Sequence, residues 1–131
     1  MSGENVEVVR SIYAAINRGD WDAAMLLVDA DFEITIQRGP NAGTHRGRDL
    51  IQMILKDQRT AFDEWIVEPE QIFESGDQVV VVVKSLLRPK GTDAGFETRN
   101  GHIWTVRDGV ALSMRGFPNP DDALDAAGLS A

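Results

Sequence analysis

The sequence contains no cysteine among its 131 residues. Disulfides, thiol nucleophiles and metal sites built on thiolates are therefore excluded. The chain also lacks a glycine-rich phosphate loop, a nucleophile elbow and a His-Glu zinc pattern. Its two histidines, His45 and His102, are far apart in the sequence. We therefore expect neither a metal ion nor an organic cofactor.

Basic residues and long apolar runs are also scarce. Lys and Arg number 13 against 21 Asp and Glu, which gives a net charge of −8. Such a surface repels phosphate backbones, so we expect no nucleic-acid partner. No apolar run approaches the length of a membrane span, and no basic cluster could bind an anionic membrane. The N-terminal residues do not resemble a signal peptide, and we expect a cytoplasmic location.

The chain does contain a helical pattern near its N-terminus. Apolar residues recur at helical spacing from Val6 to Ile16, which predicts a helix over residues 5–17. A glycine that suits a helix end follows this segment. Asp20 can then cap a second helix, which we expect over Trp21–Val28.

A third helix is predicted from about Arg48 to Asp63. Its apolar face contains Leu55 and Phe62, and Gln58 falls between them on the same face. A polar residue within an apolar stripe is unusual enough to be a candidate ligand contact. Gln58 could bind a ligand carbonyl, or it could equally well hydrogen-bond the backbone of an irregular strand.

The remaining sequence is typical of strands and turns. Pro69 interrupts one apolar segment and indicates an edge strand or a bulge. Asp108-Gly109 is a strong hairpin signal, and Asn119-Pro120 is a typical helix start. Residues 39–43 should form a loop. The predicted strands are Phe32–Ile36, Trp65–Phe73, Gln78–Arg88, Phe96–Val106 and Val110–Phe117.

Helices followed by strands predict an α+β fold, and the length suits one domain over residues 1–131. We expect a curved mixed or antiparallel sheet wrapped around three N-terminal helices. A strongly bent sheet on a long helix leaves a cavity, while its other face also needs cover. Val80, Val82 and Leu86 would share that outer face, which predicts a homodimer through the sheet.

Four segments carry a family resemblance that extends over nearly the whole chain. They are Tyr13–Asp20, Gly43–Arg48, Trp104–Gly109 and Asp122–Leu129. Together they resemble the SnoaL-like branch of the nuclear transport factor two-like superfamily. This resemblance implies a cone with a central apolar pocket for a small apolar or polycyclic ligand. The superfamily includes steroid isomerases, polyketide cyclases, epoxide hydrolases and dehydratases, so the resemblance leaves the reaction open.

The resemblance also allows two known reactions to be compared with this chain. Ketosteroid isomerase uses an Asp base, with a Tyr and a protonated Asp as oxyanion donors. The matching positions hold Ile36, Ile12 and His102, so this reaction is not expected. SnoaL-type polyketide cyclases rely on an acidic residue in the pocket. The residues expected to point inward on the last strand include Leu112 and Met114, and none is acidic.

His102 is the main candidate for chemistry. Asn100, His102 and Trp104 share one face of their predicted strand, and the resemblance places this face in the cavity. A histidine in an apolar cavity can act as an acid or base near neutral pH. Alternatively, His102 is a partly buried residue that hydrogen-bonds a backbone carbonyl or a neighbouring side chain. Tyr13 could offer its hydroxyl to a ligand oxygen or to His102, or it could pack on the helix–sheet seam.

The expected lining of the pocket combines these polar groups with apolar walls. Trp65 and Trp104 would supply apolar wall, unless they fill the core instead. We expect His102 and Tyr13 as catalytic residues, and as ligand contacts Trp104, Asn100, Gln58, Trp65, Ile36, Met114 and Ile12.

Three functions are compatible with these features. The first is a protein that binds a small apolar or polycyclic ligand. The second is an isomerase, cyclase or dehydratase that uses His102 without a metal. The third is a non-catalytic dimeric scaffold. A titrating histidine in a real cavity favours the enzyme, a cavity without one favours binding, and a filled cavity favours the scaffold.

Overall fold

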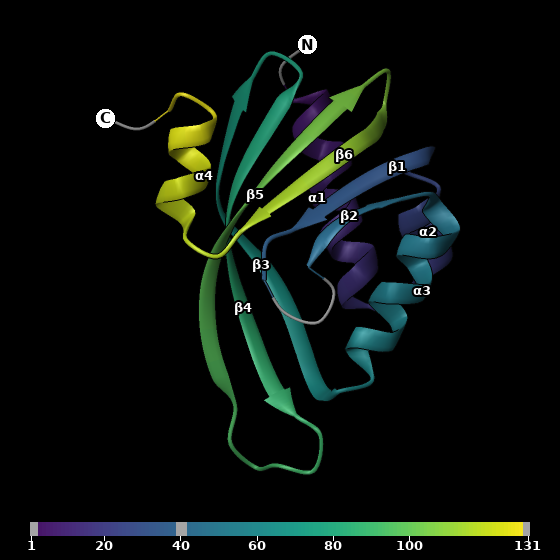
Figure 1. The fold of residues 1–131 in the computed structure, drawn as a ribbon, viewed down its shortest axis with the longest axis vertical. Helices are drawn as coiled ribbons and strands as arrows, with labels where there is room; N and C mark the ends of the chain where they lie inside the picture. The colour runs from purple at the N-terminus through teal and green to yellow at the C-terminus, as the bar shows by residue number, and fades with distance from the viewer. Residues whose placement is uncertain (1–2, 39–41, 130–131) are drawn as a thin grey trace.

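The computed structural model describes residues 3–38 and 42–129. It shows an α+β fold in which a curved, open sheet packs against helices on both faces (Figure 1). In chain order the elements are α1 (Glu4–Asn17), α2 (Trp21–Met25), β1 (Val28–Ile36), β2 (Gly43–Arg46), α3 (Arg48–Arg59), β3 (Phe62–Ser75), β4 (Gln78–Pro89), β5 (Phe96–Arg107), β6 (Val110–Phe117) and α4 (Pro120–Ala126).

The six strands lie in the order β2-β1-β6-β5-β4-β3. Only the β1–β6 pair is parallel, and the other neighbours are antiparallel, so the sheet is mixed. Figure 1 shows α1, α2 and α3 on one side of this sheet and α4 on the other. We call the side that carries α1 the inner face and the side that carries α4 the outer face. The predicted α+β class and the curved mixed sheet are confirmed.

The helix ends near the N-terminus follow the local sequence. Gly19 has a φ of 72°, the left-handed conformation that suits the residue after a helix. Asp20 Oδ1 then accepts a hydrogen bond from Ala23 N at 3.1 Å and caps α2. The prediction that this second helix extends to Val28 is wrong. Val28 begins β1 instead, where it pairs with Ala111 in the parallel ladder.

The predictions for the third helix need two corrections. The helix ends at Arg59, so the residues at 62 and 63 belong to β3 and not to its last turn. The reason is the sheet, because Phe62 pairs with Pro89 and Lys90 N donates to Ala61 O at 3.0 Å. A strand that was not predicted also precedes this helix: β2 begins at Gly43, the last residue of the expected loop, and pairs antiparallel with β1. The loop predicted over residues 39–43 falls partly on residues 39–41, which lie outside the described residues.

Two irregularities shape the sheet. The ladder between β3 and β4 shifts register between Pro69 and Gln71, and β3 is an edge strand, as Pro69 predicted. A second shift lies between β5 and β6, where the register steps by one residue on β5 and by two on β6. As a result Ala111, and not Leu112 as predicted, joins Met114 in the core on the inner face.

The core consists of two separate clusters. The larger one lies on the inner face between α1 and the sheet, and includes the wholly buried Val79, Val81 and Val83 of β4. The smaller one lies on the outer face and consists of Val80, Ile103, Phe117 and Ala123. Alternation along β4 therefore buries both faces, as expected for an uninterrupted valine run.

The outer cluster corrects one part of the predicted dimer surface. Val80 is wholly buried beneath α4 of the same chain, so it is not available to a partner. This helix begins as its sequence predicts, with Asn119 as the cap of Asp121 N and Pro120 at the first helical position. Within the described residues, no helix has the length and apolar character needed to cross a membrane.

Candidate functional site

The inner face of β5 carries the candidate site. Asn100, His102 and Trp104 lie opposite Val83, Val81 and Val79 of β4, which are core residues of the inner cluster. Helix α1 crosses this face and contributes Tyr13, whose side chain is 3% exposed. Strand periodicity therefore places the three β5 side chains on one face, and the docking of α1 adds the tyrosine.

These side chains form a continuous chain of hydrogen bonds. Trp104 Nε1 donates to the hydroxyl oxygen of Tyr13 at 2.8 Å. The Tyr13 hydroxyl lies 2.7 Å from His102 Nδ1. Since an indole N–H can only donate, the Tyr13 oxygen is an acceptor in the first bond, and its own hydrogen is available for His102. We infer that Tyr13 donates to Nδ1, which leaves the proton of a neutral imidazole on Nε2.

Burial makes this uncharged arrangement the stable one. Desolvation lowers the pKa of His102 to about 4, and the Coulombic attraction of a carboxylate is not among the causes of this shift. Burial also raises the pKa of Tyr13 well above its ordinary value, although the hydrogen bond from Trp104 acts in the opposite direction. At neutral pH the site therefore presents a neutral imidazole supported by a protonated tyrosine, and not an imidazolium or a phenolate.

Ring packing fixes the geometry of the chain. The rings of Tyr13 and Trp104 meet edge to face with centroids 5.6 Å apart. The ring of Phe32 in β1 stacks with the indole of Trp104, with the two centroids 6.0 Å apart. Contacts at these distances stabilise aromatic pairs beyond their buried area. Phe32 was not predicted as a site residue, although its place in an alternating strand already indicated that it faces inward.

Asn100 lies next to this series of hydrogen bonds but does not take part in it. Its side-chain oxygen is buried and has no hydrogen-bond partner among the described residues. Most buried polar atoms in proteins are hydrogen-bonded, so each exception calls for an explanation. Ser85 of β4, which is 7% exposed, is a further polar residue on this face that the sequence analysis missed. In the sequence, Ser85 follows the valine run of β4 at a position that alternation places on the inner face, and this could have predicted it as a site residue.

The other predicted site residues fall into two groups. Ile12 and Met114 are buried in the inner cluster, and Trp65 and Ile36 pack against that cluster while partly exposed. Gln58 is exposed, so its predicted place on the buried face of the third helix is wrong. The helix ends one residue later, and its buried face is centred on Ile51 instead. The structure thus brings together Tyr13, His102, Trp104 and Asn100 and leaves Gln58 apart.

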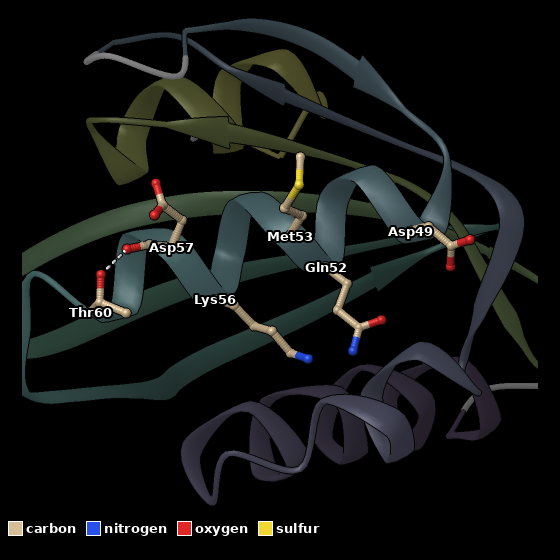
Figure 2. Close-up of a pocket in the computed structure, with 6 residues that line it drawn as sticks. All are labelled: Asp49, Gln52, Met53, Lys56, Asp57 and Thr60. Carbon is tan, nitrogen blue, oxygen red and sulfur yellow. Dashed lines mark hydrogen bonds between the residues drawn. The ribbon is translucent and has the colours of Figure 1, made fainter.

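Two surface hollows lie elsewhere in the molecule. One, of about 580 Å³, runs along α3 and is lined by Asp49, Gln52, Met53, Lys56, Asp57 and Thr60. Figure 2 shows Met53 and Asp57 pointing to one side of the helix and Gln52 and Lys56 to the other, so these groups do not converge on one point. The second hollow, of about 480 Å³, lies at the start of α1 and includes Gly109. Neither includes His102, and the central apolar pocket stays a prediction.

Groups that could ligate a metal do not gather in the described part of the chain. There, no cluster of three or more His, Asp or Glu side chains has a geometry that could hold a metal ion. The chemistry that the candidate site itself offers is therefore hydrogen bonding by neutral groups. His102 offers an N–H donor through Nε2, and Asn100 offers an unpaired amide oxygen.

The sequence matches the family model of the SnoaL-like domain over residues 9–114. The chain belongs to the SnoaL-like family. Its fold is similar to that of TerC, solved as a co-crystal with polyporic acid, with a TM-score of 0.80 and 22% identity over 94% of this chain and 97% of that one. These values show a common fold between the two proteins.

Two further solved structures extend the likeness. An NTF2-like protein from Burkholderia xenovorans has a TM-score of 0.74 and 26% identity over 96% of this chain and 97% of that one. A protein with a ketosteroid isomerase-like fold from Catenulispora acidiphila, in complex with trimethylamine, has a TM-score of 0.77 and 19% identity over 95% and 94%. No functionally curated protein matches the sequence. Family membership thus fixes the fold but not the ligand or reaction.

Proposed function

We propose that this SnoaL-like protein binds a small apolar or polycyclic ligand on the inner face of its sheet, with His102 as the polar anchor. The observation that carries the proposal is the hydrogen-bond chain from Trp104 through Tyr13 to His102 Nδ1. Such a chain fixes the imidazole tautomer and leaves the Nε2–H without a partner among the described residues, so this N–H can donate to a ligand. Binding sites combine apolar walls with a few polar groups placed in this way.

The solved relatives support this proposal at the level of the fold. TerC was crystallised with polyporic acid, and the Catenulispora acidiphila protein is in complex with trimethylamine. Both proteins resemble this chain over more than nine-tenths of its length. A fold that holds small molecules in two relatives is a reasonable scaffold for the same role here. The predicted cytoplasmic location stays a prediction.

Nuclear magnetic resonance of the two histidines tests the proposed binding. We would record the ring nitrogen signals of His102 and His45 with and without a panel of steroid-like and polyketide-like molecules. A ligand on the inner face should shift the Nε2–H signal of His102 and leave that of His45 unchanged. His102→Gln should weaken binding of the same molecule about tenfold, the effect of one lost hydrogen bond to a neutral group. If no molecule of the panel shifts the His102 signal, the proposed function is wrong.

A catalytic role is the second candidate, and the contact of Tyr13 with His102 is the observation that favours it. A neutral imidazole with an N–H at Nε2 can polarise a carbonyl oxygen and favour enolisation at the adjacent carbon. The raised pKa of Tyr13 opposes proton loss, so the tyrosine would orient the imidazole and keep its own proton. We propose binding first because the hydrogen-bond partner of His102 among the described residues is Tyr13, which keeps its own proton and cannot serve as the base.

Hydrogen exchange on a bound ketone distinguishes catalysis from binding. In D₂O, an enolising enzyme incorporates deuterium next to the carbonyl of its substrate, whereas a binding protein does not. The exchange should depend on His102 and disappear in His102→Gln. If the ketone binds but incorporates deuterium no faster than it does in solvent alone, the catalytic role is wrong and the protein only binds its ligand.

We also propose a homodimer through the part of the outer sheet face that α4 leaves uncovered. Val80 is buried under α4, but Leu86 is partly exposed and Phe73 is 37% exposed. Apolar residues on an uncovered sheet face are typical of an interface between subunits. Leu86→Arg should convert the dimer to a monomer in sedimentation velocity, with Leu26→Arg, at an exposed residue next to α2, as the control. A Leu86→Arg protein that stays dimeric would show that the interface lies elsewhere.

A further inference from the structure

Asn100 carries a buried polar atom that the fold does not use. Its Oδ1 is inaccessible to solvent and has no hydrogen-bond partner within the described part of the chain. An amide oxygen buried in this way lowers the stability of the folded protein, because water satisfied it in the unfolded chain. A leucine of almost the same size would fill the position without that loss. The asparagine therefore calls for a partner that the chain itself does not supply.

A second unused group lies two residues away on the same strand face. His102 engages Nδ1 with Tyr13, and its Nε2 has no hydrogen-bond partner among the residues that the structure describes. Because Tyr13 donates to Nδ1, the proton is on Nε2, which makes this nitrogen a donor. Two residues of strand separate the Cα atoms by roughly 7 Å. The inner face thus carries one unpaired acceptor and one unpaired donor among the described residues, two residues apart on the same strand.

We propose that the ligand of this site carries a hydroxyl next to a carbonyl, and that the hydroxyl donates to Asn100 Oδ1 while the carbonyl accepts from His102 Nε2–H. This inference rests on the proposed ligand-binding function and narrows it to neutral hydroxy-carbonyl compounds. A carboxylate fits poorly, because its two oxygens only accept and one would face the Asn100 oxygen. A plain ketone satisfies His102 alone and leaves the asparagine oxygen unpaired.

The chain contains a matched asparagine that shows the opposite behaviour. Asn17, at the end of α1, donates through Nδ2 to Val67 O at 2.7 Å and accepts through Oδ1 from Val67 N at 2.8 Å. The side-chain oxygen and nitrogen of Asn17 are both hydrogen-bonded to β3, so the role of this residue is structural. Asn17→Leu and Asn100→Leu are therefore a matched pair of variants. The first removes an amide whose oxygen is hydrogen-bonded, and the second removes one whose oxygen has no partner among the described residues.

The first experiment compares three phenyl ketones, each with a second phenyl ring on the carbon next to the carbonyl, by calorimetry and by the His102 ring signal. Benzoin has a hydroxyl next to its carbonyl, deoxybenzoin lacks the hydroxyl, and benzoin methyl ether cannot donate. We expect benzoin to bind at least tenfold more tightly than either analogue, and all three to shift the His102 signal. Asn100→Leu should remove this preference while keeping the affinity for deoxybenzoin.

The second experiment measures thermal unfolding without any ligand. Asn17→Leu should lower the melting temperature by several degrees, whereas Asn100→Leu should leave it unchanged or raise it. Equal losses in both variants would show that Asn100 has a structural partner, and the inference would fall. Equal affinity of the wild-type protein for benzoin and deoxybenzoin would also overturn it, with the proposed function intact. If none of the three ketones shifts the His102 signal, the hydroxy-carbonyl inference is wrong, and the broader ligand panel then decides on the proposed function.

Discussion

The two faces of the sheet are covered in different ways. On the outer face α4 packs against β5 so closely that a Cβ at Gly101 would lie 2.4 Å from Ala123 Cβ. The cluster there consists of Val80, Ile103, Phe117 and Ala123, and is wholly apolar. On the inner face α1 packs against the same strand, but it does so through Tyr13, which hydrogen-bonds the side chains of Trp104 and His102.

This difference separates wholly apolar packing from polar packing along one strand. Residues of β5 alternate between the faces, so Ile103 belongs to the apolar outer cluster and its neighbours at 102 and 104 to the polar chain. An apolar cluster stabilises the fold without directing any group toward a ligand. A buried polar chain is stable only when its members are satisfied, and the unsatisfied groups here are the ones that we propose for ligand binding. The inner face carries such groups, at His102 and Asn100.

The strongest test of the outer face is Gly101→Val. The new side chain would meet Ala123 Cβ at 2.4 Å and Pro120 Cα at 3.2 Å, so α4 must move away from the sheet. We expect a loss of about 3 kcal/mol in the free energy of unfolding, measured with urea. The smaller change Gly101→Ala should also destabilise the fold, because its Cβ meets Ala123 Cβ. Adding Ala123→Gly to this variant should recover part of that loss, because it removes the colliding methyl group. Full stability of Gly101→Val would contradict the close packing.

Tyr13→Phe tests the inner face. It removes the hydroxyl that accepts from Trp104 and donates to His102, and leaves both groups buried without a partner. We expect a loss of about 2 kcal/mol or slightly more in urea unfolding. The ring nitrogen signals of His102 should also show a mixture of tautomers, which a purely apolar packing role for Tyr13 would not produce. A single unchanged tautomer would show that Tyr13 does not set the proton position.

The pH dependence of stability distinguishes the half-buried imidazole of His102 from other titrating groups. Burial lowers the pKa of His102 to about 4 from an ordinary value of 6.5. The unfolded chain therefore binds a proton near pH 6.5 and the folded chain does not, so His102 contributes stability above pH 6.5 that is lost as the pH falls toward 4.

The expected size follows from these two values. Between pH 7 and 5 the wild-type protein should lose at most about 2 kcal/mol more than His102→Gln, since a partly exposed ring keeps some hydration. Denaturant unfolding of both proteins at each pH measures this difference. The carboxylates contribute equally to both proteins, so their pH-dependent contribution cancels in the comparison. Parallel pH profiles would show that His102 titrates in the folded protein as it does in the unfolded one.

The smallest expected effect concerns the cap of the outer helix. Asn119 Oδ1 accepts from Asp121 N at 2.9 Å, and Asn119→Ala removes this bond at a cost of about 1 kcal/mol. The change should leave the His102 tautomer unaltered, because α4 lies on the opposite face of the sheet. A shift of the His102 signal in Asn119→Ala would show that the two faces of the sheet are coupled, and would contradict the separation between them.

Local sequence predicted those features whose causes are local. The Asp108-Gly109 turn has φ angles of 54° and 81°, as a two-residue hairpin requires. Pro69 marks an edge strand with a bulge, and the caps at Asp20 and Asn119 are where the sequence indicated. Each of these depends on the conformational preference of a residue and its immediate neighbours, so a single segment carries the information.

Other features depended on pairing between distant segments. The third helix ends at Arg59 because the following residues pair with β4, and the helix-like spacing of Phe62 is overridden by that ladder. The register shift between β5 and β6 selects Ala111 for the core in place of Leu112. A ladder is fixed by two strands at once, so neither segment alone determines it.

By itself the sequence determined the fold class, the four helices of the described residues, the strands other than β2, and the face shared by Asn100, His102 and Trp104. Periodicity of two along β5 is enough for that, because successive side chains of a strand point to opposite sides. Only the tertiary structure decided that α4 covers Val80, that Gln58 is exposed, and that Asn100 Oδ1 has no partner in the described chain. It also decided that Tyr13 sits between Trp104 and His102, 91 and 89 residues away in sequence, because contacts at such separations exist only after α1 has docked on the sheet.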